Sequence, residues 1–279
     1  MLSVRNQFHE NSIDYRTNGK TIVERLEDVE NLQEVYDCCV ANDERIECDI
    51  DSLYQQEVEP DEMLVDWLFS GDMEDDYDLR RMLMAIFQTF SEMEEERDCT
   101  IHISMGTQDG CICDEKGYWS ERRKHLKEIC KTSEFYEFMK TCFVKTEFSD
   151  VVGASLREID DFAQHTEEIV HNLSLLNDEA IEIYERHNRS SKDAIRELAS
   201  KALDCSGDPK HKDMLKFPFS YFVEGNGEKQ AEVAEIVCEP HMKLIRRDSD
   251  LRIYFYWRDN RIANGEKVLI GKIGRHPYK

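Results

Sequence analysis

The sequence predicts an α+β protein in which a large, acidic, mainly helical region, residues 1–206, precedes a small antiparallel β-rich domain, residues 207–279. Helical spacing of apolar residues prevails in the first region, whereas short runs rich in β-branched and aromatic residues follow it. Charge changes with the pattern: residues 215–279 hold 12 Lys and Arg against 9 Asp and Glu, while the preceding 214 residues carry a net charge of −27. This asymmetry predicts two parts with different roles.

Composition and length limit the class of protein. The 279 residues suffice for one large or two ordinary domains, and 40% hydrophobic residues with only 5 Pro and 12 Gly indicate a packed core. No apolar run approaches the ~20 residues of a membrane helix. The first fifteen residues lack the apolar segment of a secretory signal, and the ten cysteines are irregularly spaced. We therefore expect reduced thiols, a cytoplasmic location and no membrane association.

Several helices are expected in the acidic region. The segment 21–40 repeats apolar residues at helical spacing, a brief strand is expected within 45–54, and the next helix begins near Pro60 and stops at Gly71. The clearest amphipathic helix begins at Tyr77, because its apolar residues recur at intervals of three and one: Leu79, Met82, Leu83, Ile86, Phe87 and Phe90.

A strand and a glycine-punctuated loop interrupt the helices between residues 99 and 119. Helical patterns resume from residue 120 and continue to about residue 202. The polar stretch "DCSGDPKHKD", residues 204–213, then predicts the domain boundary.

Four β-rich runs follow the boundary, at residues 217–223, 234–239, 251–257 and 267–273. In the third run, strand alternation places Leu251, Ile253, Phe255 and Trp257 on one face and Arg252, Tyr254, Tyr256 and Arg258 on the other. The pair Asn264-Gly265 before the last run is a strong hairpin signal.

The polar face of this hairpin has the residue types that recognise RNA. Arg presents forked donors to phosphate, and aromatic rings stack on bases. The chain closes with Lys272, Arg275, His276 and Tyr278, in which a histidine can exchange protons and cations can stabilise a phosphorane-like transition state. These residues would form a metal-independent ribonuclease site. The alternative is an ordinary sheet with a solvated cationic face.

The segment "PHMKLIRRDSDLRIYFYW…KVLIGKIGRHPYK" resembles the RelE/ParE/HigB toxin superfamily over about 40 residues. The matching positions are Lys243-Leu244, residues 251–254 and residues 268–276. The resemblance implies a small twisted antiparallel sheet packed by helices; many members cleave mRNA without a metal, and others inhibit gyrase. It implies four catalytic candidates, Arg252, Arg275, His276 and Tyr278. Five further cations would bind nucleic acid: Lys243, Arg246, Arg247, Arg258 and Lys272.

A second candidate is a zinc site. Cys99, His102, Cys111 and Cys113 supply four ligands of the type that zinc prefers within fifteen residues, although their spacing matches no familiar zinc pattern. Cysteines that are merely small buried residues are the alternative. Cys238 and His241 are expected to shape a turn. The carboxylates at 47–51 and 72–78 could bind a divalent cation, but solvated helix starts are the favoured interpretation in so acidic a chain.

These patterns predict a RelE-like toxin or metal-independent endoribonuclease that the acidic helical region regulates, in a toxin–antitoxin, phage-defence or stress-response setting. RNA or another polyanion would bind the C-terminal hairpin, and a protein partner would bind the acidic region. Two alternatives are a non-enzymatic protein- or nucleic-acid-binding module and a structural subunit of a larger complex.

Overall fold

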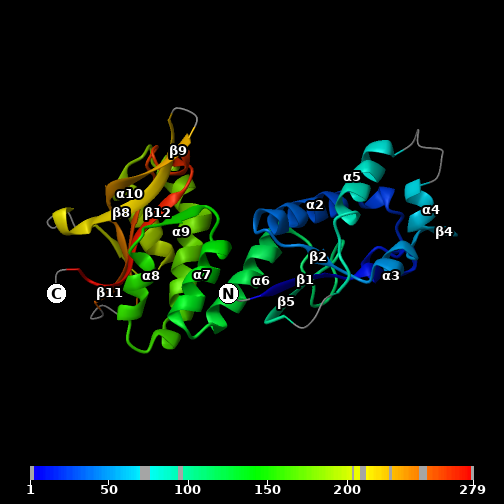
Figure 1. The fold of residues 1–279 in the computed structure, drawn as a ribbon, viewed down its shortest axis with the longest axis horizontal. Helices are drawn as coiled ribbons and strands as arrows, with labels where there is room; N and C mark the ends of the chain where they lie inside the picture. Colours follow the sequence, from blue (N-terminus) through cyan, green and yellow to red (C-terminus); the bar gives the residue numbers. More distant parts are fainter. Residues whose placement is uncertain are drawn as a thin grey trace. The chain divides into compact units, whose positions relative to one another are not determined.

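The computed structural model describes residues 3–69, 76–93, 97–202, 204–207, 212–225, 228–244 and 250–277. The chain divides into two compact units, residues 2–125 and 126–279 (Figure 1). Helices and small sheets occur in both units, and the C-terminal part is rich in strands, which confirms the predicted α+β class.

The first unit is built on a parallel sheet with the strand order β2-β1-β5. Its strands are β1 (Val4–Phe8), β2 (Ile46–Glu47) and β5 (Cys99–Ile103); β3 (Glu57–Glu59) and β4 (Glu62–Met63) form a separate pair. The helices are α1 (Tyr15–Asn18), α2 (Leu26–Ala41), α3 (Ile50–Tyr54), α4 (Leu64–Phe69) and α5 (Tyr77–Phe87). Helix α6 (Glu115–Glu128) runs across the boundary between the units in the sequence.

Strand β5 lies within the segment where the sequence predicts a strand, and burial alternates along it because strand residues point in turn to opposite faces of a sheet. Ile101 and Ile103 are fully buried, whereas His102 between them is half-buried. On β1, the Phe8 ring lies 5.4 Å from the ring of Phe90 and 6.3 Å from that of Phe87, so α5 and the residues after it cover the apolar face. The amphipathic helix predicted from Tyr77 is confirmed.

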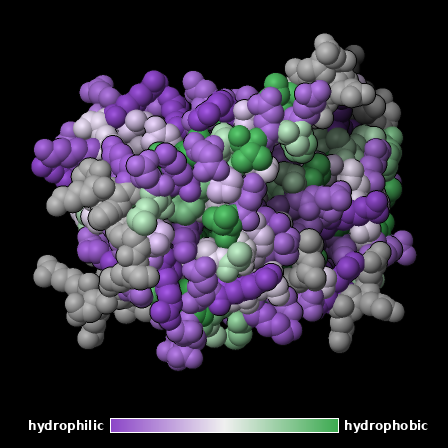
Figure 2. Space-filling view, turned by 60° about the vertical axis from the view of Figure 1, so that its left-hand side comes forward, coloured by the Kyte–Doolittle hydropathy of each residue, from purple (hydrophilic) through white to green (hydrophobic). Residues whose placement is uncertain are grey.

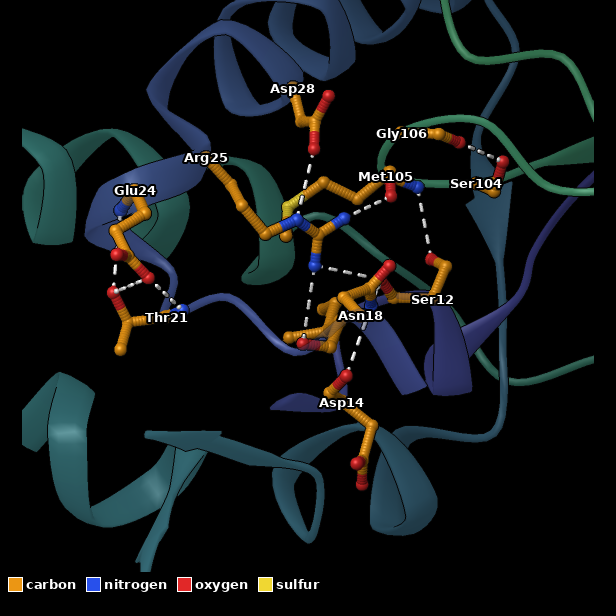
Figure 3. A network of polar contacts seen from close by, with 11 residues as sticks. Ser12, Asp14, Asn18, Thr21, Glu24, Arg25, Asp28, Ser104, Met105 and Gly106 are labelled. Carbon is orange, nitrogen blue, oxygen red and sulfur yellow. Dashed lines mark hydrogen bonds and ion pairs between the residues drawn. The ribbon is translucent and has the colours of Figure 1, made fainter. Parts of the chain in front are cut away.

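A buried arginine holds the loops at the carboxyl edge of this sheet together (Figure 3). Arg25, which is 4% exposed, donates to the Asp28 carboxylate at 2.9 Å and to the Ser12 carbonyl at 2.9 Å, and it also reaches the Met105 carbonyl. The Ser12 hydroxyl in turn accepts from the Met105 amide at 2.9 Å. One guanidinium therefore joins the segment after β1, the start of α2 and the loop after β5.

The second unit surrounds a five-stranded sheet with the order β6-β12-β11-β10-β7. The strands are β6 (Thr146–Phe148), β7 (Cys205–Ser206), β10 (His241–Lys243), β11 (Leu251–Tyr256) and β12 (Val268–Arg275), and all neighbours are antiparallel except β6 and β12. Its helices are α7 (Thr132–Cys142), α8 (Val152–Ser155), α9 (Thr166–Arg186) and α10 (Ser191–Lys201). A two-stranded ribbon, β8 (Lys216–Gly225) with β9 (Glu228–Val237), completes the unit.

Both faces of this sheet are covered. On one side, the Trp257 ring stacks on Tyr184 of α9 at 4.8 Å, and its indole N–H donates to Ser191 of α10 at 3.0 Å. On the other side the ribbon packs on the sheet, in a cluster that contains Phe217, Phe219, Ala234, Ile236, Tyr254 and Leu269. The sheet is thus the middle layer between helices and the ribbon.

The boundary between the units lies near residue 125, whereas the sequence predicts it at residue 206. Strand β6 pairs with β12 through Thr146 and Val268, and the short strand β7 pairs with β10. Long-range pairing therefore places residues 126–206 with the C-terminal strands. The acidity follows the observed boundary, since residues 2–125 carry a net charge of −20 and residues 126–279 carry −4.

The surface is mainly hydrophilic on the face that Figure 2 shows, where hydrophobic residues form separate small patches. Within the described ranges, no helix is both long and apolar enough to cross a bilayer.

Candidate functional site

Polar residues from four adjacent strands lie on one face of the C-terminal sheet. Directly paired residues of neighbouring strands point to the same face. Two rows follow from the register, Ser206, His241, Tyr254 and Lys272 in the first and Lys243, Arg252 and Gly274 in the second. We call this set the Tyr254 face.

Tyr254 lies at the centre of this face and is fully buried. Its ring centroid is 5.2 Å from the ring of His241 and 6.0 Å from the ring of His276, which it meets edge-on. On the ribbon side, Phe217 lies 6.1 Å away. Two histidines from β10 and from the end of β12 therefore flank one tyrosine.

The orientation of His241 is fixed by two neighbours. Its Nδ1 lies 3.3 Å from the Glu239 carbonyl, and its Nε2 lies 3.0 Å from the Ser206 hydroxyl. Because a carbonyl oxygen only accepts, this contact requires the proton on Nδ1, and in a neutral ring Nε2 would then accept from Ser206. The residue is 6% exposed. This is the tautomer in which Nε2 can act as a base.

Arg252 is 8% exposed and donates from Nη1 to the Leu251 carbonyl at 2.8 Å. Burial lowers the pKa of Arg252, and the neighbouring Tyr254, Asp250 and Asp204 oppose that effect. The backbone amide of His276 donates to the Asp250 carbonyl at 2.8 Å, which brings the end of β12 to the start of β11.

The cations of the hairpin have acidic partners from the same unit. Nζ of Lys272 lies 2.9 Å from Oε2 of Glu158, and Nη2 of Arg258 lies 2.7 Å from Oε1 of Glu185. Three further pairs follow the same plan: Lys243 with Asp204, Arg275 with Asp160, and Lys267 with Glu147. The basic end of the chain is thus matched by carboxylates from residues 147–204.

The structure brings together four of the predicted residues, Lys243, Arg252, Lys272 and His276, on the Tyr254 face. Two others point elsewhere. Arg275 directly precedes His276, so its side chain points to the other face, and its guanidinium donates to the Asp160 carboxylate and the Glu158 carbonyl. Arg258 follows the end of β11 and pairs with α9, so it does not share a face with Arg252. Arg246, Arg247 and Tyr278 lie outside the described residues.

The predicted solvated face is largely closed, because the ribbon packs on Tyr254 and Arg252 is buried as well. The sequence prediction assigns His241 to a turn and so misses its place in the site, and it also misses Ser206. A signal is present for His241, since it precedes Lys243 by two residues and strand alternation places both on one face. Ser206 carries no such signal, because its strand has only two residues.

The four predicted zinc ligands are close in the sequence, but two lie on strand β5 and two in the loop that follows it. Cys99 is buried and lies on the opposite face of β5 from His102, whereas Cys111 and Cys113 are half-buried in the loop that follows. Burial and the neighbouring His9 lower the pKa of His102. Within the described ranges, no group of three or more His, Cys, Asp or Glu side chains is arranged to hold a metal ion. The zinc site stays a prediction.

Comparison with known proteins gives no relative from which residue roles could be transferred. No protein-family model matches the chain, and neither a curated protein nor a solved structure shows significant similarity to it.

Proposed function

We propose that the Tyr254 face is the active site of a RelE-like, metal-independent endoribonuclease. The observation that carries the proposal is the grouping of two histidines, an arginine and two lysines around one buried tyrosine. Metal-free cleavage of RNA needs a base, an acid and cations at the phosphate. On this face, His241 and His276 would supply the base and the acid, and Arg252 with the two lysines would supply the cations.

The two histidines would act in different steps of the reaction. His241 is held with Nε2 as the acceptor and takes the proton of the ribose 2′-hydroxyl while that oxygen attacks the adjacent phosphorus. The bond from phosphorus to the 5′-oxygen breaks as His276 gives a proton to the leaving oxygen. The products are a 2′,3′-cyclic phosphate and a 5′-hydroxyl end, so atoms and protons balance without a co-reactant.

Arg252 and Lys243 lie in the row next to the histidines and would bind the phosphate whose charge grows in the transition state. Lys243 is held by Asp204, and Lys272 by Glu158. Incoming phosphate would compete with these carboxylates. Cleavage should therefore begin with exchange of an ion-pair partner, and substrate binding should weaken as salt rises.

The test uses the full chain, a fluorescent RNA oligonucleotide and EDTA in the buffer. His276→Ala should lower the cleavage rate about 100-fold or more, the ordinary contribution of a proton donor. Arg275→Ala is the matched control, because it changes the adjacent residue, which turns to Asp160; its rate should stay within about threefold of the wild type.

A DNA oligonucleotide of the same sequence is the second control, because it lacks the 2′-hydroxyl and should remain intact. Equal RNA cleavage by the wild type and His276→Ala, or cleavage of the DNA, would contradict the proposed chemistry.

A non-enzymatic RNA-binding or protein-binding module is the second candidate. The observation that favours it is burial, since Tyr254 and Arg252 are closed off and both lysines are engaged. In that case the wild type would bind RNA without forming product, and His276→Ala would bind it equally well.

A further inference from the structure

Two histidines of the N-terminal unit face each other at one edge of the parallel sheet. A hydrogen bond of 2.9 Å joins Nε2 of His9 to Nδ1 of His102, and the two ring centroids are 5.1 Å apart; a metal ion bound by both nitrogens would take the place of the shared proton. Both side chains are half-buried, so solvent reaches the pair. This pair is independent of the Tyr254 face, which belongs to the other unit.

Backbone hydrogen bonds fix both residues. His102 lies opposite Gln7 in the register of β1 and β5, and its carbonyl accepts from Ile112 at 2.8 Å. His9 directly follows β1, and its amide donates to the Ile103 carbonyl at 2.9 Å. The two rings are therefore held by the strands and do not depend on a long flexible loop.

The histidine pair lies at the carboxyl ends of β1 and β5, a position at which open parallel sheets commonly bind ligands. Strand β1 is the central strand in the order β2-β1-β5. The chain runs from β1 to β2 on one side of it, and then from β2 to β5 on the other side. The carboxyl ends of β1 and β5 thus form the topological switch point, outside which open parallel sheets bind their ligands. The two imidazoles lie at this edge.

We propose that His9 and His102 chelate a divalent transition-metal ion, with Cu²⁺ or Ni²⁺ preferred. Imidazole nitrogens bind such ions at ~2.0–2.1 Å. Two nitrogens 2.9 Å apart then subtend an angle of about 90° at the ion. That angle suits the square-planar or tetragonal sites of Cu²⁺ and Ni²⁺ better than tetrahedral Zn²⁺.

The surroundings favour a cation and leave the ion open to other ligands. The unit carries a net charge of −20, which raises the local concentration of cations. Among the described side chains, no third His, Cys, Asp or Glu completes a set with the pair. Water or a small molecule would fill the remaining positions, as in metal sites that exchange ligands.

The test titrates the full chain with Ni²⁺ by calorimetry in a non-coordinating buffer. The wild type should bind one ion, and His9→Gln and His102→Gln should each weaken binding about tenfold or more. His171→Gln is the matched control, because it removes an exposed histidine of α9 and should leave the affinity unchanged. A clearly smaller loss in either pair variant, or an equal loss in the control, would overturn the proposal.

A spectroscopic measurement covers the case in which a variant misfolds. Cu²⁺ bound to an otherwise wild-type chain with Cys130→Ser, which removes the exposed thiol, should show electron paramagnetic resonance couplings to two imidazole nitrogens. A spectrum with oxygen ligands alone would reject the site, whatever the variants do.

Discussion

Burial determines what each arginine can do in this protein. Arg252 is 8% exposed and lies beside the buried Tyr254, whereas half of the Arg275 side chain is exposed and its guanidinium pairs with the surface carboxylate of Asp160. Arg25 is the strongest case, because one guanidinium binds a carboxylate and three carbonyls inside the first unit (Figure 3).

Replacing Arg25 should therefore be costly. Arg25→Met would leave the Asp28 carboxylate and buried carbonyls without their donor, and we expect a loss of about 3 kcal/mol in the free energy of unfolding. Lys124→Met is the control, because the Lys124 side chain is 64% exposed and pairs with Glu121, and such surface pairs contribute about 0–1 kcal/mol. Urea denaturation measures both. Equal losses in the two variants would contradict a structural role for the Arg25 network.

Thiol reactivity gives a second prediction at this scale. Burial raises the pKa of Cys38, Cys39 and Cys48 to about 12, so at pH 8 only about one in ten thousand of these thiols is ionised. Cys130 is exposed. A thiol-specific reagent at pH 8 should therefore label one cysteine rapidly, and Cys130→Ser should abolish that rapid phase. Persistence of the rapid phase in this variant would show that another thiol is accessible.

At the scale of elements, the ribbon of β8 and β9 has one buried and one exposed face. Phe219 is 1% exposed and packs on the sheet, whereas Phe222 is 72% exposed on the other side of the same strand. Phe219→Ala should lower the free energy of unfolding by about 3–5 kcal/mol, and Phe222→Ala should change it little. Chemical denaturation of the two variants tests this. Similar effects would mean that the ribbon does not cover the sheet.

The sequence predicts elements better than their pairing. The helix from Tyr77 and the strands around Ile253 and Ile270 follow from local periodicity, and the structure contains all of them. The parallel pairing of β6 with β12 joins Thr146 to Val268, and no local pattern encodes a contact across such a separation. The Tyr254 face is only partly predictable for the same reason, because it depends on which strands are neighbours.

For the whole molecule, the division near residue 125 decides which fragment is stable. A fragment of residues 126–279 keeps β6, β7 and the helices that cover the sheet, whereas residues 207–279 lose all of them. The longer fragment should unfold cooperatively on heating, followed by circular dichroism, and the shorter one should show no cooperative transition. Cooperative unfolding of the shorter fragment would restore the boundary at residue 206.

The same division predicts how charge would affect the proposed binding of RNA. Removing residues 1–125 takes away a net charge of −20 and leaves −4, so the 126–279 fragment should repel a polyanion less than the full chain does. Its affinity for RNA should therefore exceed that of the full chain at low salt. The difference should shrink as salt approaches about 1 M, where the screening length falls to about 3 Å. Fluorescence anisotropy at several salt concentrations measures both affinities. A difference that persists at high salt would indicate that the first unit blocks the site by direct contact, and equal affinities at low salt would show that its charge has no regulatory effect.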